Sequence, residues 1–293
     1  MQTLLASVLV VGLSAGAAGA EETYLIKLYR SKEGTKSRVE KNERGKVDTV
    51  INGDGVKKEE AVTSDTKEIY TEEVLAIDAT TKQITKLSRK YTVAEKTEKG
   101  ETTKAVYAGK TVLIEKIDGA FTFSVDGKPL SEDAAPDLIK SYKDKKADEP
   151  TNEDLVPTEA VAVGRTWKVP VDKADKTLKL LGDGKIKFDA SKSTIEGKLV
   201  KVYKKVGAQF GVMEFTITAV VTEIGSGDES VATTTDSKMV MKITIDTCID
   251  GTVEFEDATA DASVDIVAEF PQAGSVSVRG AVTFTSKINA LKK

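Results

Sequence analysis

The sequence contains no histidine, one cysteine, one tryptophan and few aromatic residues of any kind. Without histidine, the chain lacks the commonest general base and the commonest metal ligand in proteins. A single cysteine excludes Cys-rich zinc sites and any disulfide within the chain. Aromatic residues make up 5% of the sequence, so stacking surfaces for sugars or single-stranded nucleic acid are scarce.

Positive and negative charges nearly balance, with 43 Lys and Arg against 47 Asp and Glu. This balance gives no basic surface for nucleic acid or for an anionic membrane. The serine-hydrolase elbow and the glycine-rich phosphate loops are absent, and the acidic loops do not follow the calcium-loop pattern. Paired carboxylates could hydrolyse glycosides, but sequence spacing selects no pair among so many acids. We therefore predict no enzymatic activity and no catalytic residue, cofactor site or metal site.

Residues 1–20 have the pattern of a secretory signal peptide. An apolar run from Leu4 to Leu13 is followed by small residues that end at Ala20, and charge begins at Glu21. The run is too short to span about 30 Å of hydrocarbon as a transmembrane helix. We expect cleavage near Ala20, export to the periplasm or the extracellular space, and a mature chain without a transmembrane segment.

Apolar and polar residues alternate through much of the remaining sequence, most regularly in the last hundred residues. The runs 213–222, 263–270 and 276–288 place apolar residues at every second position. This period is typical of antiparallel sheets that have one face in water. Asp250-Gly251 has the composition of a two-residue hairpin turn, and the polar stretch Asn52–Thr66 is interpreted as a loop. The pattern predicts a mainly β fold, with antiparallel meanders that form curved sheets, a half-barrel or a sandwich.

Two short helices are predicted, over 133–143 and 173–181. The first combines a capping Asp, a Pro in its first turn and apolar residues at helical spacing, and Gly182 follows the second. A charged segment that ends near residue 154 is interpreted as a linker. These features divide the chain into a signal peptide (1–20), an N-terminal β-rich half (21–150) that contains the first helix, and a C-terminal meander half (151–293). Whether the two halves share one core stays open at this stage.

Two single residues attract functional hypotheses. Cys248 falls on the polar face of its strand, which predicts a partly exposed and unpaired thiol. The alternatives are a disulfide between chains or a nucleophile, and a nucleophile would need a base to form the thiolate. Trp167 follows a turn at Gly164, and it is either a core anchor at the start of the second half or a wall of a ligand cavity.

The segment that begins at Pro157 and continues as Val161-x-Val163-Gly164-x-x-Trp167 resembles a signature of a family of uncharacterised exported bacterial β-rich proteins. The later run from Ile243 to Ile288 is similar to the C-terminal meander of that family. The resemblance covers residues 155–290, and Arg165 departs from it at a position where an acidic turn residue is expected. The resemblance implies an exported, β-rich, non-catalytic protein, and it transfers no site residues.

The sequence supports two functional hypotheses from different classes. The export pattern, the meanders and the lack of catalytic groups favour a periplasmic binding or carrier protein that encloses an apolar, lipid-like ligand between a curved sheet and its helix. The alternative is a structural or protein-interaction module of the cell envelope without a small ligand, because charge-rich strands protect sheet edges from nonspecific pairing. A third hypothesis, a two-carboxylate hydrolase, requires a cleft with two inward carboxylates, one of raised pKa. The carrier hypothesis requires a cavity on the concave face of the sheet.

Overall fold

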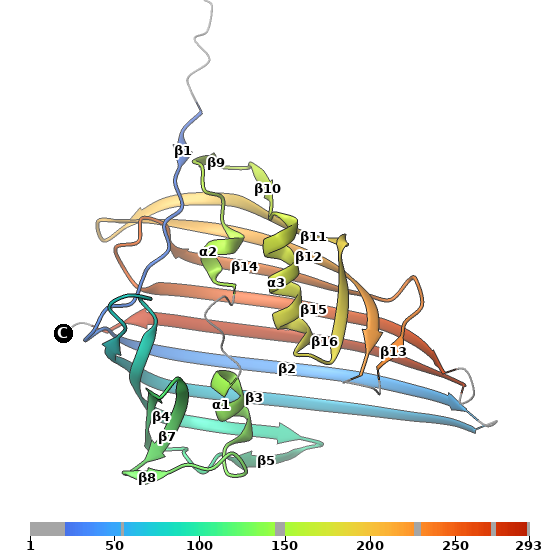
Figure 1. Cartoon of the computed structure of the whole chain (residues 1–293). Helices are drawn as coiled ribbons and strands as arrows, with labels where there is room; N and C mark the ends of the chain where they lie inside the picture. Colours follow the sequence, from blue (N-terminus) through green and yellow to red (C-terminus); the bar gives the residue numbers. More distant parts are fainter. Residues whose placement is uncertain (1–20, 54–55, 144–149, 226–229, 271–273, 292–293) are drawn as a thin grey trace, which may run out of the picture.

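The computed structural model describes residues 21–53, 56–143, 150–225, 230–270 and 274–291 (Figure 1). The predicted signal peptide and half of the predicted linker lie outside these residues. The main element is a 14-stranded antiparallel sheet, which is open at both ends. In chain order, its strands are β2 (Lys36–Gly53), β3 (Val56–Ile77), β4 (Ile84–Glu98), β5 (Glu101–Lys104), β6 (Thr111–Ile117), β7 (Ala120–Val125), β8 (Lys128–Pro129), β10 (Thr166–Lys168), β11 (Ile186–Lys205), β12 (Ala208–Ile224), β13 (Val231–Ala232), β14 (Lys238–Cys248), β15 (Phe255–Phe270) and β16 (Gly274–Ala290).

The described residues also form a small two-stranded sheet and three short helices. The small sheet pairs β1 (Thr23–Tyr24) with β9 (Val161–Ala162). The helices are α1 (Pro136–Lys143), α2 (Asn152–Leu155) and α3 (Val171–Gly182). The predicted mainly β class, the antiparallel pairing and the two predicted helices are confirmed, and α2 is an addition to the prediction.

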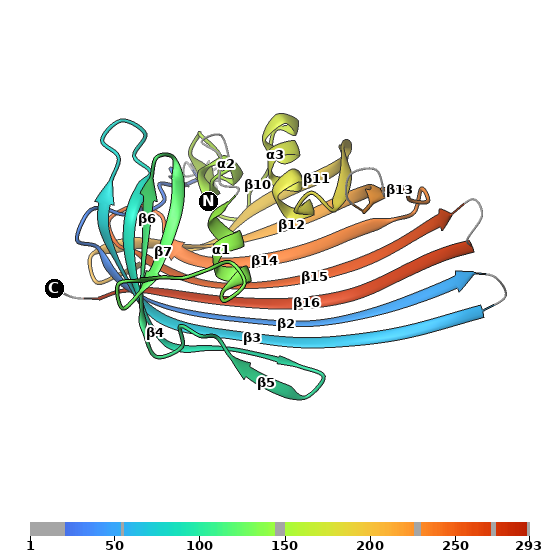
Figure 2. The same cartoon turned by 60° about the horizontal axis from the view of Figure 1, so that its bottom comes forward.

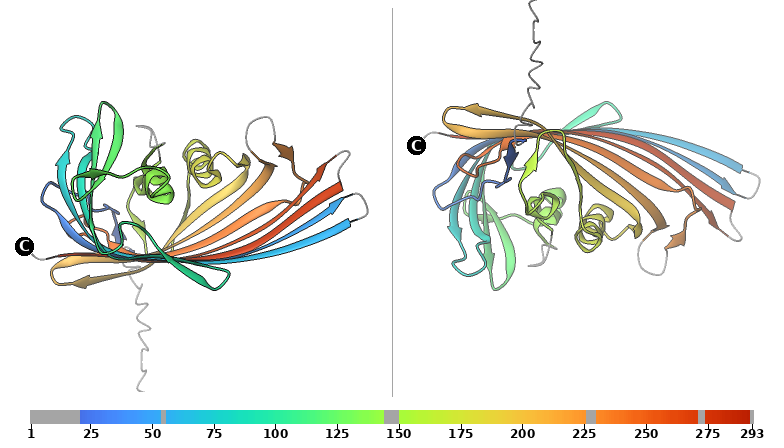
Figure 3. Two further views of the ribbon diagram at one scale, coloured as in Figure 1. Left: turned by 90° about the horizontal axis from the view of Figure 1, so that it is seen from below. Right: turned by 90° about the horizontal axis from the view of Figure 1, so that it is seen from above.

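The main sheet curves strongly, and its helices lie on the concave side (Figure 2). At one end the sheet curls up through β4, β6 and β7, while at the other end the long strands extend as a single layer (Figure 3). The strand order runs β10-β11-β12-β14-β15-β16-β2-β3-β4-β6-β7-β8. Strands from both sides of residue 150 therefore lie in the same sheet, where β16 pairs with β2.

The alternating sequence pattern produces the two faces of this sheet. Residues that lie directly opposite one another in antiparallel strands point to the same face. One such row on the concave face consists of Ile195, Ile217, Met241, Ala262 and Val282. The neighbouring row on the convex face consists of Glu196, Thr216, Lys242, Asp261 and Thr283. The sheet thus buries its apolar side chains on the concave face and exposes polar ones on the convex face.

The core consists mainly of three clusters on the concave face. Helix α1 covers the first cluster with Leu138, Ile139 and Tyr142, which pack against strands at the curled end. Helix α3 covers the second with Ala174 and Leu178. The third lies under the N-terminal segment that contains β1, and its buried members are Ile26, Leu199, Met213, Phe215 and Ile249. No helix in the described ranges is long and apolar enough to cross a membrane.

Two local predictions were wrong. The described residues of the stretch Asn52–Thr66 are not a loop, because they belong to the long hairpin of β2 and β3, whose register continues to Gly53 and Val56. In this single-layer part of the sheet, charged side chains occupy both faces and hide the strand pattern. The turn at Asp250-Gly251 is longer than two residues, since β14 ends at Cys248 and β15 begins at Phe255.

Candidate functional site

A groove of about 1070 Å³ lies on the concave face, between the core clusters under α1 and under the N-terminal segment. This volume is at the upper end of the roughly 300–1,000 Å³ of small-molecule pockets. The groove, called the concave groove below, is lined by Leu28, Tyr29, Arg30, Ser31, Lys32, Glu33, Ile77, Asp78, Ala79, Thr81, Lys82, Gln83, Ile84, Thr151, Asn152, Glu153, Leu155, Val156, Met213, Phe215, Ile245, Thr247, Glu254, Phe255, Glu256 and Ile288.

The floor of the concave groove is built from neighbouring strands of the sheet. Met213 of β12 lies directly opposite Ile245 of β14, and Phe215 is the next residue of β12 on the same face. Ile288 of β16 lines the floor on the far side. The alternation of these strands places Met213, Phe215, Ile245 and Ile288 in the groove together with Thr247, so the floor is mainly apolar.

One wall of the groove is the N-terminal strap, which we define as residues 25–35. Its backbone is fixed near both ends, where the Lys27 N–H donates to the Ile249 carbonyl at 2.8 Å and the Gly34 N–H donates to the Val74 carbonyl at 2.8 Å. Between these points, Arg30 donates two hydrogen bonds, at 2.7 and 2.6 Å, to the carboxylate of Glu153. This bidentate pair joins the strap to α2.

A second wall, next to the strap, is the turn between β3 and β4. Asp78 accepts hydrogen bonds from the backbone N–H groups of Thr81 at 2.6 Å and Thr80 at 2.9 Å. These bonds, with the one from the Thr81 hydroxyl, hold the pKa of Asp78 below its usual range. Glu33 of the strap accepts from the Ile77 N–H at 3.1 Å, so the strap and this turn are in direct contact.

Two carboxylates, Glu254 and Glu256, also line the groove. Burial raises the pKa of Glu254, and hydrogen bonds from Ser37 and Ser31 oppose this shift. Burial also raises the pKa of Glu256, and the charge of Lys41 opposes it. The structure therefore brings together two inward carboxylates of raised pKa, the arrangement that the sequence alone did not select.

Next to Glu256 lies a buried charge cluster, which we define as Lys41, Glu68, Glu72 and Arg89 on β2, β3 and β4. Arg89 Nε donates to Glu72 Oε2 at 2.7 Å, with the two side chains only 13% and 21% exposed. Burial lowers the pKa of Lys41, as does the charge of Arg89, while Glu68, Glu72 and Glu256 raise it. The three neighbouring carboxylates thus help Lys41 to keep its charge in this setting.

Four tyrosines, Tyr70, Tyr91, Tyr107 and Tyr142, separate this cluster from water. The Arg89 guanidinium lies 4.7 Å from the ring centre of Tyr70 and 5.4 Å from that of Tyr142. The Tyr107 hydroxyl donates to Glu68 at 3.3 Å, and burial raises the pKa of Tyr70 to about 12. Because charges attract more strongly away from water, the aromatic wall strengthens the Arg89–Glu72 pair.

The raised pKa of Glu256 leads to a pH prediction for Glu256→Gln. Since the folded-state pKa lies above the unfolded one, the folded protein binds more protons between the two values, and its stability falls as pH rises through the folded pKa. A glutamine at this position does not ionise, so the variant does not lose stability in this way. Its melting temperature relative to the wild type is therefore expected to be higher at pH 7 than at pH 4, as measured by calorimetry.

The control for this measurement is Glu214→Gln on the exposed convex side of β12. It removes the same charge from a site in water and is expected to change stability by less than about 0.5 kcal/mol. A relative stability of Glu256→Gln that decreases between pH 4 and pH 7 would contradict the assignment of Glu256 as a buried carboxylate.

Trp167 lies on the concave face beside the groove floor and is not among the residues that line the groove. Its indole Nε1 donates to the Leu155 carbonyl at 2.8 Å. The ring meets Phe215 edge-on, with centroids 5.9 Å apart. Trp167 thus supports two residues that do line the groove, Leu155 and Phe215.

The prediction that Cys248 is partly exposed was wrong, because its side chain is fully buried. It lies on the convex face as predicted, opposite Phe210. At this end of the sheet, however, Tyr203, Phe210 and Phe255 form a small apolar cluster that covers it. Its thiol donates to Asp250 at 3.0 Å, so the cysteine has a local structural partner.

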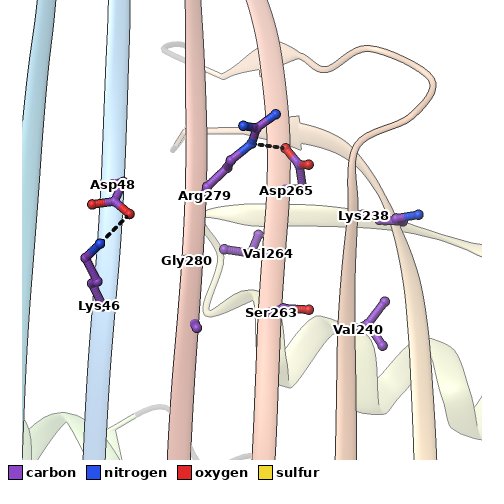
Figure 4. A pocket seen from close by; sticks show the side chains of 10 residues that line it. Lys46, Asp48, Lys238, Val240, Ser263, Val264, Asp265, Arg279 and Gly280 are labelled. Atoms are coloured by element: carbon purple, nitrogen blue, oxygen red, sulfur yellow. Dashed lines mark hydrogen bonds and ion pairs between the residues drawn. The ribbon is translucent and has the colours of Figure 1, made fainter.

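A second hollow, of about 400 Å³, lies on the convex face of the single-layer part of the sheet (Figure 4). Four of its charged side chains are engaged in pairs, Lys46 with Asp48 at 3.0 Å and Arg279 with Asp265 at 3.3 Å. We assign this hollow no function.

No protein-family model matches the chain, and no curated protein matches it. Among solved structures, an outer membrane channel from Pseudomonas putida F1 is similar over 91% of this chain and 98% of that chain, with 10% identity and a TM-score of 0.23. At this TM-score the likeness carries no argument about fold or function. The functional conclusion therefore depends on the residues of the chain itself.

Proposed function

We propose that this protein is an exported, non-catalytic binding protein that holds an apolar ligand in the concave groove. Export rests on the signal-peptide pattern of residues 1–20. The single observation that carries the proposal is an unfilled groove of about 1070 Å³ over an apolar floor. A concave face packed solid with side chains would have ruled it out.

The proposal gives the two inner carboxylates no catalytic role. Glu254 accepts hydrogen bonds from Ser37 and from Ser31. Glu256 lies beside Lys41 and Ser286. Both carboxylates are thus engaged with neighbouring side chains, which supports a structural role in the groove lining.

The alternative function, an envelope interaction module, has one observation in its favour. Beyond α3, the concave face of β15, β16, β2 and β3 is a single layer that no described helix covers (Figure 2). Its apolar side chains there, such as Val47, Val264 and Val278, are half-buried among themselves. A protein that binds no small ligand in the experiment below, but that crosslinks to an envelope protein, would favour this alternative.

The proposed function is tested by filling the groove. Val156→Phe adds a ring to the wall, and Ile245→Phe adds one to the floor. The probe is N-phenyl-1-naphthylamine, a neutral apolar dye whose fluorescence increases in apolar surroundings. We expect one dye per wild-type chain and about tenfold weaker binding by the double variant, since an overpacked site costs about 1–3 kcal/mol.

The matched control is Val171→Phe, an equal change at a 59% exposed position on α3 outside the groove. It is expected to bind the dye as the wild type does. Equal binding by the wild type and the groove-filling variant would place the dye elsewhere and overturn the proposal. Native mass spectrometry of the gently purified protein would show a bound natural ligand directly.

A further inference from the structure

The charged side chains at the mouth of the concave groove differ in whether they already have a partner within the protein. The acidic groups are engaged internally: Glu153 with Arg30, Asp78 with its own turn, and Glu33 with the Ile77 N–H. The mouth also carries two lysines, Lys32 on the strap and Lys82 on the β3–β4 turn. Neither ammonium group forms an ion pair or a side-chain hydrogen bond with any described residue.

The two lysines lie on walls that touch each other. Lys32 precedes Glu33, whose carboxylate bonds to the backbone at the start of the turn that carries Lys82. Both side chains are exposed, so a ligand group at the mouth can reach them. Because each ammonium offers three donors and no acceptor, the uncommitted groups at the mouth match an anionic oxygen.

Another part of the lining has the opposite character. Glu254 and Glu256 lie there, in a partly buried setting that disfavours additional negative charge. The floor is mainly apolar, with Met213, Phe215 and Ile245. A ligand with one anionic end is therefore favoured with its anion at Lys32 and Lys82 and its apolar part on the floor.

We propose that the ligand of the concave groove is an anionic amphiphile, whose carboxylate or phosphate binds Lys32 and Lys82 while its hydrocarbon chain lies on the floor. This inference rests on the proposed function and adds the chemical class and the orientation of the ligand. Arg30 is not part of the anion site, because both of its contacts are made to Glu153.

The test is displacement of N-phenyl-1-naphthylamine by four compounds. Palmitate carries the anion and the chain, hexadecanol is neutral, hexadecylamine is cationic, and inorganic phosphate is an anion without a chain. We expect palmitate to displace the dye best and phosphate not to displace it. Lys32→Gln/Lys82→Gln is expected to weaken palmitate about three- to tenfold, in line with exposed ion pairs, and to leave hexadecanol unchanged.

The matched control is Lys110→Gln/Lys128→Gln, which removes two exposed lysines outside the groove. It corrects for the change in net charge and is expected to leave all four compounds unchanged. Equal displacement by palmitate and hexadecanol, with no effect of Lys32→Gln/Lys82→Gln, would overturn the anion site but leave the proposed function standing. Displacement of the dye by phosphate alone would contradict the proposal that the ligand is an amphiphile. Failure of the dye and of every chain compound to bind would overturn the proposed function as well.

Discussion

Replacement of Gly197 by alanine is expected to lower the free energy of unfolding by about 3 kcal/mol, through overpacking and a lost hydrogen bond. Gly197 of β11 lies directly opposite Trp167 of β10. A Cβ atom at this position would lie 2.6 Å from the indole Nε1, well inside contact distance. The ring would have to move away from Phe215 and break its bond to the Leu155 carbonyl. Urea unfolding measures the change.

Two further variants make this prediction specific. Gly45→Ala is the matched control, because its Cβ would meet only Ser64 Oγ at 3.3 Å and Val282 Cγ2 at 3.5 Å. We expect it to change the unfolding free energy by less than about 1 kcal/mol. In Gly197→Ala/Trp167→Leu, the clash is gone, so the combined loss should be smaller than the sum of the single losses. Additive losses would show that Gly197 and Trp167 do not interact.

Replacement of Arg89 by methionine is expected to lower the free energy of unfolding by about 3–5 kcal/mol, the usual effect of breaking a buried ion pair. The variant leaves Glu72 without its partner at 2.7 Å. It also removes the cation from the faces of Tyr70 and Tyr142. A large loss would support the view that the buried charge cluster holds the curled end of the sheet.

The control for Arg89 is Arg44→Met, which breaks an ion pair with Asp65 at 2.7 Å. Arg44 is 72% exposed, so this loss is expected to stay below about 1 kcal/mol. The double variant Glu72→Gln/Arg89→Met removes both charges and should recover part of the loss of Arg89→Met. Equal effects of Arg89→Met and Arg44→Met would show that burial does not strengthen the Arg89–Glu72 pair.

Sequence periodicity correctly predicted those strands that have one face against the core and the other face exposed to water. The run 213–222 is such a case, since β12 alternates between the core and the convex surface. It failed where neither face is packed, as in Asn52–Thr66 of the β2–β3 hairpin. It also misjudged the exposure of Cys248, because its cover comes from Tyr203 and Phe255 on other strands. The local sequence pattern predicts on which face of the sheet a side chain lies, but not which other residues cover that face.

The concave groove could not be predicted from local signals. Its walls come from the strap, the β3–β4 turn and α2, and its floor comes from β12, β14 and β16. Lys32 and Lys82 are far apart in the sequence, as are Met213 and Glu254, and no sequence motif contains both members of either pair. The signals that could have suggested a site were weak and general: the alternation that makes the floor apolar, and the acidic residues at 254 and 256, which fall on one face.

The adjacency of β2 and β16 has a consequence for how this chain folds. These two strands form the middle of the sheet, yet β2 is the first long strand of the described sequence and β16 the last. Contacts between such distant segments form slowly. During synthesis, one edge of β2 therefore stays without its partner strand until β16 has been made. The charges along that edge, among them Glu43, Arg44 and Lys46, are the kind that prevent a waiting strand from pairing with another chain.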